Sequence, residues 1–289
     1  MVMGAILFGT CSWKYPSWLD LVYSQSDPDS YLAEYAQQFE MVEIDQWFWS
    51  LGRQSAGLPK HETVVRYAGA TGDTFKFTIK CPNALTRPFH DTSPQETIRP
   101  NEFFLDPSLM HAFIASLEPI RSKIGLLMFQ FGYLNKRSME SQALFMGKLD
   151  RFFQELPQGL PYAIELRNPA WLHGDWFTWL TDRHIAPVLI QGYWMDDISQ
   201  TIERYEQLFG ETVSIRLHGE DREEMEIDSG GQWNRIINPR DRELAKIALS
   251  ITTMAERGRT VFVQVNNHYE GSAPLTIERL RAVIHGADC

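Results

Sequence analysis

Eight short apolar segments of this chain each stop on a polar or charged residue. A loop and a stretch with helical apolar spacing then follow. Alternating strands and helices of this kind form parallel sheets with right-handed crossovers. Eight such units predict an α/β fold of the (β/α)8 TIM-type barrel class, whose sites are built at the C-terminal ends of the strands. The segments are Ile6–Ser12, Met41–Asp45, Phe75–Cys81, Gly125–Phe131, Tyr162–Arg167, Pro187–Gln191, Val213–His218 and Val261–Asn267.

The length of 289 residues suits one barrel domain over residues 1–289. Two connections, Pro82–Asp106 and Gly219–Arg240, are longer than a tight turn from strand to helix. They follow the third and seventh strands, so we expect irregular long loops that overhang the C-terminal face. The acidic run Glu220–Glu226 is more typical of a solvated loop surface than of a metal site.

Helix signals fall between the strands. The clearest is Asp241–Arg257, where Leu244 and Ile251 share an apolar face and Gly258 stops the helix. Further helices are predicted from Asp29 to about Phe39, over Lys60–Gly69, from Asp106 and Pro107 to Ile120, after a cap at Ser138, around Trp176, around Ile202, and over about Pro274–Ile284.

Composition limits the partners of the chain. Hydrophobic residues make up 44% of it, enough for a large core, and the formal net charge is −10. This field repels nucleic-acid backbones and anionic membranes, so nucleic acid is an unlikely partner. The sequence contains no run of 18 apolar residues, so we expect no membrane span and a soluble cytoplasmic protein. Oligomeric state is not indicated.

The three cysteines, Cys11, Cys81 and Cys289, lack the paired spacing of a disulfide framework or a zinc site. Cys11 and Cys81 fall at strand ends, where a redox or catalytic thiol is one interpretation. The favoured interpretation is two small buried hydrophobic side chains in a reducing compartment.

Side-chain alternation predicts which residues face the barrel axis. Residues two apart on a strand share a face, so Glu43 and Asp45 point the same way, and Arg216 and His218 do too. Their apolar neighbours suit the layer beneath the outer helices. The charged set is therefore predicted to face inward at the open end of the barrel. The same argument applies to Glu165 with Arg167 and to Lys76 with Thr78 and Lys80.

These inward charges have two interpretations. Buried ion pairs such as Glu43–Lys80 or Glu165–Arg216 stabilise a barrel without doing chemistry. Polar ends on so many strands exceed what packing needs, which favours a functional site. Lys76 would lie deep, so we expect it to have an acidic partner or to sit at the lower end of the barrel.

A candidate anion site follows the eighth strand. Gly271 precedes a helix that Ser272 or Ala273 would cap, with Pro274 in its first turn. A helix N-terminus at this place in a barrel is a recurrent phosphate position, to which Arg216 would add a bidentate contact. The alternative is that Gly271 only permits a tight turn.

Aromatic residues follow the first two strands. They would wall a pocket for a sugar or a base, or pack beneath loops, which we favour for at least half of them. They are Trp13, Tyr15, Trp47, Phe48 and Trp49.

Seven motifs, in order along nearly the whole chain, resemble the YecE-like family, a domain of unknown function numbered 72. They are GTCSWKYPSW, VEIDQWFWSL, FKFTIKCPNALT, GLLMFQF, IELRNPAWL, VSIRLHG and VFVQVNNHYEGSA. The resemblance implies a TIM-type barrel and supplies no reaction. It places emphasis on Trp13, Tyr15, Glu43, Lys80, Gln130, Glu165, Arg167, Arg216, His218, Asn266 and Asn267. The chain departs from the family pattern at Cys11, Ser12, Asp45, Gln46, Trp47 and Arg87, which bears on substrate more than on fold.

The favoured function is an enzyme for a small, polar, anionic substrate such as a phosphorylated or carboxylated sugar. Arg167 and Arg216 would hold the anion, with Gln130, Asn266, Asn267, Tyr15, Trp13 and Ser272 completing the pocket. Glu43 and Glu165 would serve as acid and base. His218 is the alternative proton shuttle, and Lys80 an electrostatic stabiliser or, less favoured, a Schiff-base amine. Isomerase, lyase and hydrolase chemistry all stay open, and no cofactor is predicted.

Two other classes of function are kept. In the first, Glu43, Asp45, Glu165 and His218 bind a divalent metal, against the repulsion of the nearby cations. In the second, the chain is a non-catalytic binder of a nucleotide, a single-stranded nucleic acid or a protein, and the net charge opposes the nucleic acid.

Overall fold

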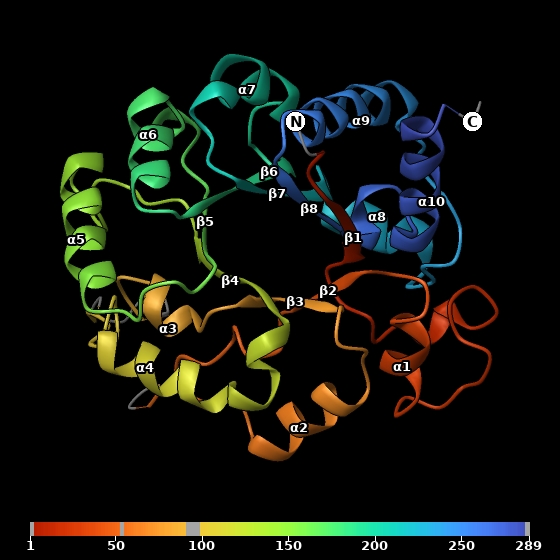
Figure 1. The fold of residues 1–289 in the computed structure, drawn as a ribbon, viewed down its shortest axis with the longest axis horizontal. Helices are drawn as coiled ribbons and strands as arrows, with labels where there is room; N and C mark the ends of the chain where they lie inside the picture. Colours follow the sequence, from red (N-terminus) through yellow and green to blue (C-terminus); the bar gives the residue numbers. More distant parts are fainter. Residues whose placement is uncertain (1–2, 53–54, 91–98, 287–289) are drawn as a thin grey trace.

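All eight predicted strands are present in a computed structural model of the chain, which describes residues 3–52, 55–90 and 99–286. Each strand pairs in parallel with the next, and β8 pairs with β1 to close the barrel (Figure 1). The fold is the predicted (β/α)8 barrel. The strands are β1 Ile6–Thr10, β2 Met41–Ile44, β3 Lys76–Lys80, β4 Ile124–Phe131, β5 Tyr162–Leu166, β6 Ala186–Gly192, β7 Thr212–Gly219 and β8 Thr260–Val265.

Helices surround the strands (Figure 1). The α-helices are α1 Tyr31–Tyr35, α2 His61–Gly69, α3 Asn83–Thr86, α4 Pro107–Ser116, α5 Gln142–Gln154, α6 Gly174–Asp182, α7 Ile198–Tyr205, α8 Arg222–Ser229, α9 Asp241–Glu256 and α10 Ala273–Ile284. Short 3-10 helices lie at Pro16–Trp18, Glu118–Lys123, Pro169–Trp171, Glu206–Leu208 and Asn267–Tyr269.

The alternation of side chains separates two apolar layers, as predicted. Residues such as Val42 and Ile215 point outward into the large cluster beneath the helices. A smaller cluster, which includes Met41, Met128 and Phe262, fills the lower part of the barrel interior. The inward-facing residues above this smaller cluster are polar, so the functional side chains lie on a packed apolar layer.

Lys76 illustrates the lower end of the barrel. It is the first residue of β3, and its Nζ donates to the carbonyl oxygen of Ser122 at 3.0 Å. The expectation that it sits at the lower end is confirmed, and its partner is a backbone carbonyl.

Helix starts differ from prediction in two places. Ser141, not Ser138, caps α5, and its hydroxyl accepts from the amide of Leu144. The side chain of Asn135 accepts from the amide of Ser138, so the chain makes a turn there before the helix begins. Helix α1 is also shorter than expected, because residue 30 occupies its N-cap position.

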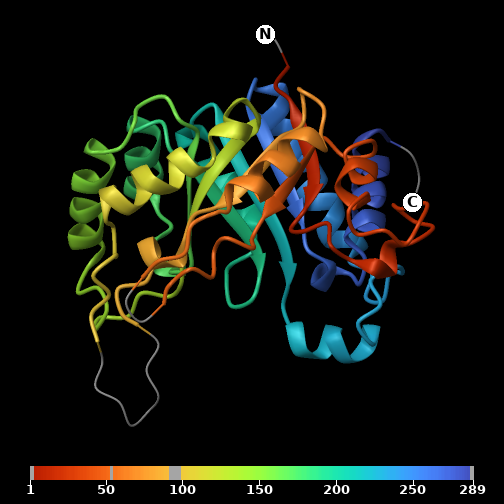
Figure 2. The ribbon, with the colours of Figure 1, turned by 90° about the horizontal axis from the view of Figure 1, so that it is seen from below.

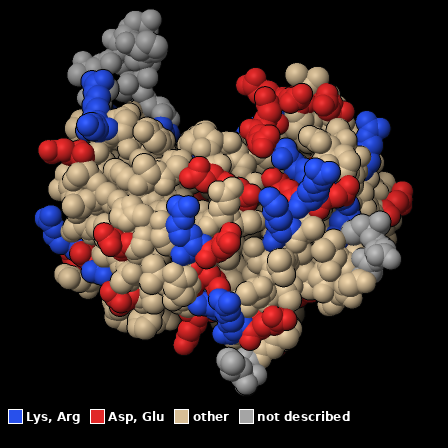
Figure 3. All heavy atoms as spheres, turned by 90° about the horizontal axis from the view of Figure 1, so that it is seen from above, with Lys and Arg blue, Asp and Glu red and all other residues tan. Residues whose placement is uncertain are grey.

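The acidic stretch after β7 is a helix, which corrects the prediction of a loop surface. Asp221 caps α8 by accepting from the amide of Glu224 at 3.0 Å, and Gly230 ends it with φ of 57°. Helix α8 projects beyond the C-terminal ends of the strands (Figure 2). Its acidic side chains are exposed, as expected, and the surface beside them is hollowed (Figure 3).

Cys11 and Cys81 are free and buried, as the favoured interpretation required. Cys289 lies outside the described residues. Over those residues, no helix combines the length and apolarity needed to cross a membrane.

Candidate functional site

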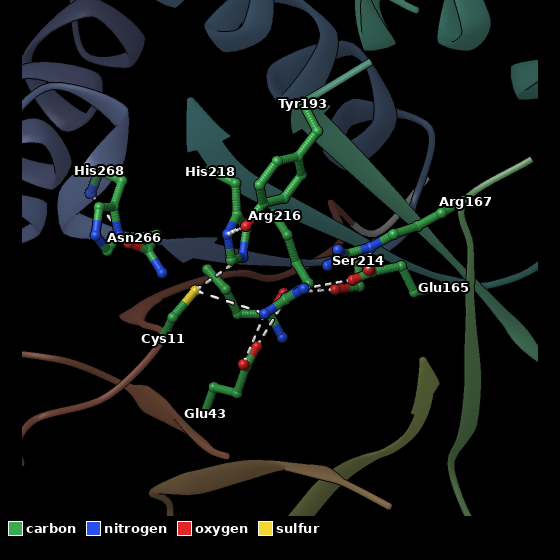
Figure 4. A network of polar contacts seen from close by, with 11 residues as sticks. Cys11, Glu43, Glu165, Arg167, Tyr193, Ser214, Arg216, His218, Asn266 and His268 are labelled. Carbon is green, nitrogen blue, oxygen red and sulfur yellow. Dashed lines mark hydrogen bonds and ion pairs between the residues drawn. The ribbon is translucent and has the colours of Figure 1, made fainter. Parts of the chain in front are cut away.

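Arg216 is the centre of the polar network at the C-terminal end of the barrel (Figure 4). It extends from β7 and is 1% exposed. Its Nε and Nη2 donate to the two carboxylate oxygens of Glu43 on β2, at 2.8 and 2.7 Å. Its Nη1 donates to Glu165 on β5. One guanidinium therefore ties together three strands and neutralises two buried carboxylates.

This network shows which of the predicted ion pairs form. The Glu165–Arg216 pair is confirmed, and Glu43 pairs with Arg216 and not with Lys80. Every nitrogen of the Arg216 guanidinium already has a protein acceptor. Arg216 therefore has no free pair of nitrogens for the bidentate contact with an anionic ligand that we predicted from the sequence.

Glu165 is fully buried and held from two sides. Arg167, which follows β5, donates from Nε to its second oxygen at 2.6 Å. Burial opposes ionisation of this carboxyl, but Arg216, Arg167 and Lys80 outweigh burial and lower its pKa from 4.5 to about 2. Glu165 is thus an ionised structural anion at neutral pH.

We expect this shift to appear in the acid stability of the protein. A lowered native pKa stabilises the fold above pH 4.5, and that stabilisation is lost as the pH falls toward about 2. The shift corresponds to roughly 3 kcal/mol. Guanidinium unfolding of wild type and Glu165→Gln across this range should show their difference shrinking as the pH falls. A Glu62→Gln control on the exposed face of α2 should run parallel to wild type, and a constant difference for Glu165→Gln would contradict the assignment.

Lys80 is the unpaired cation of the site. It ends β3, is 8% exposed, and its Nζ lies 4.0 Å from the centroid of the Phe48 ring. Within residues 3–52, 55–90 and 99–286, its ammonium meets no hydrogen-bond acceptor and no carboxylate within ion-pair distance. On the neighbouring β4, Oε1 of Gln130 is buried and also lacks a partner. The wall formed by β3 and β4 therefore presents polar groups that the protein leaves unused.

His218 lies across the mouth from this wall. Its Nδ1 is 3.2 Å from the hydroxyl of Tyr193, and its Nε2 is 3.6 Å from Sγ of Cys11. Burial, followed by the cations Arg216 and Arg167, lowers the pKa of His218 well below 6.5. Burial raises the pKa of the Cys11 thiol above its usual range. At neutral pH this group is a neutral imidazole beside a protonated thiol.

Tyr193 is a site residue that our sequence reasoning missed. Its ring stacks under the guanidinium of Arg167, 4.8 Å from centroid to Cζ, while its hydroxyl meets His218. The local signal is a Gly-aromatic pair directly after an apolar strand. Tyr193 has φ of 55°, and its amide donates to the carbonyl of Gly219 at 2.9 Å. A non-glycine residue in this region is strained, and such strain concentrates at functional sites.

The turn before α10, where the sequence predicts an anion site, is buried. Ser272 is fully buried, and the amide of Ala273 already donates to Oδ1 of Asn267 at 2.9 Å. Glu270 is buried in the same turn and accepts from the hydroxyl of Thr276. A protein oxygen therefore takes one amide that a phosphate would use, whereas the buried Oγ of Ser272 and Nδ2 of Asn267 have no hydrogen-bond partner in the part of the chain that the structure describes.

The remaining predicted pocket residues separate into mouth and core. Asn266 follows β8 and faces the network beside Cys11 (Figure 4). Tyr15 is partly buried, and Trp13 is 3% exposed and packs edge-on against Tyr67. Trp47 and Phe48 are also buried, and Phe48 lies against Lys80, whereas Trp49 is exposed.

Two of the carboxylates proposed as metal ligands, Glu43 and Glu165, are arranged around Arg216. Among the residues that the structure describes, no group of three or more His, Cys, Asp or Glu side chains is placed to hold a metal ion. Both oxygens of Glu43 and both of Glu165 contact arginine nitrogens. This donor set does not fit a divalent cation.

Comparison with known proteins agrees with this architecture. The chain is 27% identical over 168 residues to the UPF0759 protein YecE of Escherichia coli K12, a match that spans 57% of this chain and 49% of YecE. It therefore aligns to about half the length of that relative. The crystal structure of a DUF72 family protein from Enterococcus faecalis V583 superposes with a TM-score of 0.69 at 20% identity, covering 97% of this chain and 95% of the other.

A DUF72 family protein from Thermotoga maritima MSB8 gives a TM-score of 0.68 at 17% identity, over 97% of this chain and 99% of the other. The family described as "Protein of unknown function DUF72" matches residues 7–288. The chain therefore belongs to the DUF72 family, whose members have the TIM-barrel fold and no assigned function.

Proposed function

We propose that this protein is an enzyme that transfers protons on a small, polar, anionic substrate of the phosphorylated or carboxylated sugar type. One observation carries the proposal: the cations of the β3–β5 side keep free donors inside a site whose carboxylates are already neutralised. In the part of the chain that the structure describes, Lys80 has no hydrogen-bond acceptor. Arg167 donates from Nε to Glu165, and neither of its Nη atoms has an acceptor there. Buried donors without acceptors are costly unless a ligand supplies the acceptors.

Positive and negative side chains lie on different sides of the barrel mouth. This separation determines where the anionic group of the substrate would bind. Lys80 and Arg167 lie on β3 and after β5. The acidic side chain of Asp45, after β2, acts electrostatically on Cys11 and Tyr15, on the side of β1 and β2. An anionic group is therefore favoured on the β3–β5 side, within reach of the amide of Gln130.

Proton transfer is assigned to His218. Both oxygens of Glu165 already accept from Arg167 and Arg216, so this carboxylate is not placed to take a proton from a ligand. Both oxygens of Glu43 are held by Arg216. His218 is neutral, has an imidazole nitrogen beside Tyr193, and lies across the mouth from the free cations. This moves the proposed chemistry from the two glutamates to the histidine.

The test begins with a thermal-shift screen of phosphorylated and carboxylated sugars and their neutral parents, followed by NMR assays of turnover. We expect anionic compounds to raise the melting temperature and at least one to be converted. Given such a substrate, His218→Gln should lower kcat by about 10²–10⁴-fold with little change in ligand Kd. Arg167→Met should mainly weaken binding.

The matched control is His111→Gln, because His111 lies on α4, away from the strand ends, and its Nε2 is hydrogen-bonded to the backbone carbonyl of Glu155. It should leave kcat unchanged. Stabilisation by neutral compounds alone, or full turnover by His218→Gln, would contradict the proposal. Salt-sensitive binding of an oligonucleotide without turnover would support the non-catalytic alternative instead.

A further inference from the structure

Lys80 is a buried amine for which the described residues, 3–52, 55–90 and 99–286, provide no counter-ion within ion-pair distance. The other charges of the network are paired, since Arg216 holds Glu43, and Glu165 is shared between Arg216 and Arg167. Lys80 rests instead on the face of the Phe48 ring. Removing an ammonium from water without an acceptor is costly, so this position favours the neutral amine.

Another buried lysine shows what a structural role requires. Lys123 is 7% exposed, and its Nζ donates to the carbonyl oxygens of Ala68 and Thr71, each at 2.7 Å. Lys80 is buried to the same degree and has no such acceptors among the described residues. The difference indicates that Lys80 is kept for its reactivity or for a ligand.

The surroundings of Lys80 are those that activate a lysine as a nucleophile. An amine becomes nucleophilic when it is desolvated or placed beside another cation, because both favour loss of its proton. Burial lowers the pKa of Lys80, and Arg216 adds to this effect. The two nearby carboxylates oppose it, but both already bind arginine.

We propose that Lys80 forms an imine with the aldehyde or ketone group of an anionic substrate. This rests on the proposed function, in which Arg167 holds the anionic group of the same molecule. The lone pair of Nζ attacks the carbonyl carbon, and the carbonyl π electrons move to oxygen, which takes a proton to give a carbinolamine. The nitrogen then loses a proton and the hydroxyl oxygen gains one. The C–O bond breaks, water leaves, and the nitrogen lone pair forms the C=N bond of the protonated imine. No oxidant or reductant is needed.

His218 and the imine would divide the chemistry between them. A protonated imine withdraws electrons from the neighbouring carbon, which makes a proton or a carbon substituent there easier to remove. The neutral imidazole of His218 is the group available to accept that proton. The substrate class is therefore a keto or aldehyde acid, or a keto or aldehyde phosphate.

The experiment traps the imine by reduction. The full chain is incubated with dihydroxyacetone phosphate, pyruvate, or uncharged dihydroxyacetone, each with sodium cyanoborohydride, and adducts are located by peptide mass spectrometry. We expect Lys80 to be labelled by an anionic ketone about tenfold or more faster than exposed Lys60 or buried Lys123. Lys80→Met should lose this label and keep a melting temperature near wild type, since methionine can still pack on Phe48 and the described residues offer Lys80 no hydrogen bond or ion pair to lose. Arg167→Met should retain Lys80 labelling but lose the preference for the phosphorylated ketone.

Labelling confined to exposed lysines, with Lys80 unmodified by all three ketones, would overturn the proposal. So would turnover of a substrate by Lys80→Arg at the wild-type rate, an outcome that leaves the proposed acid–base function intact. Trapping at Lys80 without any anion preference would support the amine and contradict the anion-binding function.

Discussion

Replacing Arg216 by methionine will lower the free energy of unfolding by about 3–5 kcal/mol, because two buried carboxylates lose their shared counter-ion. Glu43 and Glu165 are 1% and 0% exposed, and neither can turn to water in the folded state. Methionine keeps much of the apolar volume of the arginine side chain, so the decrease in the free energy of unfolding reflects the lost charge and not lost packing. Guanidinium unfolding followed by tryptophan fluorescence measures it.

The loss should depend on pH in a defined direction. Burial already raises the pKa of Glu43, and without Arg216 it raises this pKa further, whereas Glu165 keeps its contact with Arg167. The folded variant therefore binds more protons than its unfolded chain. The deficit therefore shrinks as the pH falls toward 4.5. Adding Glu43→Gln and Glu165→Gln to the same variant should recover most of the loss at neutral pH.

Arg222→Met is the matched control. Arg222 pairs with Glu226 at 2.8 Å on the exposed face of α8, and its side chain is 66% exposed. Exposed pairs of this spacing contribute about 0.3–0.5 kcal/mol, so this variant should remain near wild type. A deficit for Arg216→Met no larger than that of Arg222→Met would contradict the central role given to this guanidinium.

The barrel and the ring of inward charges follow from the sequence because strand geometry has a period of two. Once Val42 and Ile44 are assigned to the helix layer, Glu43 must face the axis, and the structure places it there. The same logic placed Arg216, but it carried no information on partners. Which carboxylate each cation contacts depends on how the barrel closes. Glu43 pairs with Arg216 across the barrel axis and not with Lys80.

Other parts of the site depend on features that strand periodicity does not report. Tyr193 reaches His218 only because the chain leaves β6 in a left-handed conformation. Helix α8 was not predicted, because its acidic composition suggested a solvated loop. Its cap, Asp221, and its stop, Gly230, were nevertheless present in the sequence. In the turn before α10, the sequence did not show that Asn267 accepts from the amide of Ala273.

Gly192→Ala tests whether the backbone at the C-terminal ends of β6 and β7 holds Tyr193 in position. Gly192 ends β6 with φ of 124°, where a Cβ is strained, and an added Cβ would overlap the carbonyl oxygen of Gly219 on β7. Strain and overpacking together should lower the free energy of unfolding by about 2–6 kcal/mol. The displaced backbone should also move the hydroxyl of Tyr193 from His218, which the ¹⁵N shifts of that imidazole would report.

Gly147→Ala is the control of opposite sign. Gly147 lies inside α5, and an added Cβ there meets no atom within 4 Å. Alanine restricts the unfolded chain and suits a helix, so this variant should be about 0.4–1 kcal/mol more stable than wild type. If both alanine variants shifted stability in the same direction, or Gly192→Ala left the His218 shifts unchanged, the strained end of β6 would have no part in positioning the site. Opposite signs, with an imidazole perturbed only by Gly192→Ala, would establish that the backbone at the ends of β6 and β7 positions Tyr193 against His218.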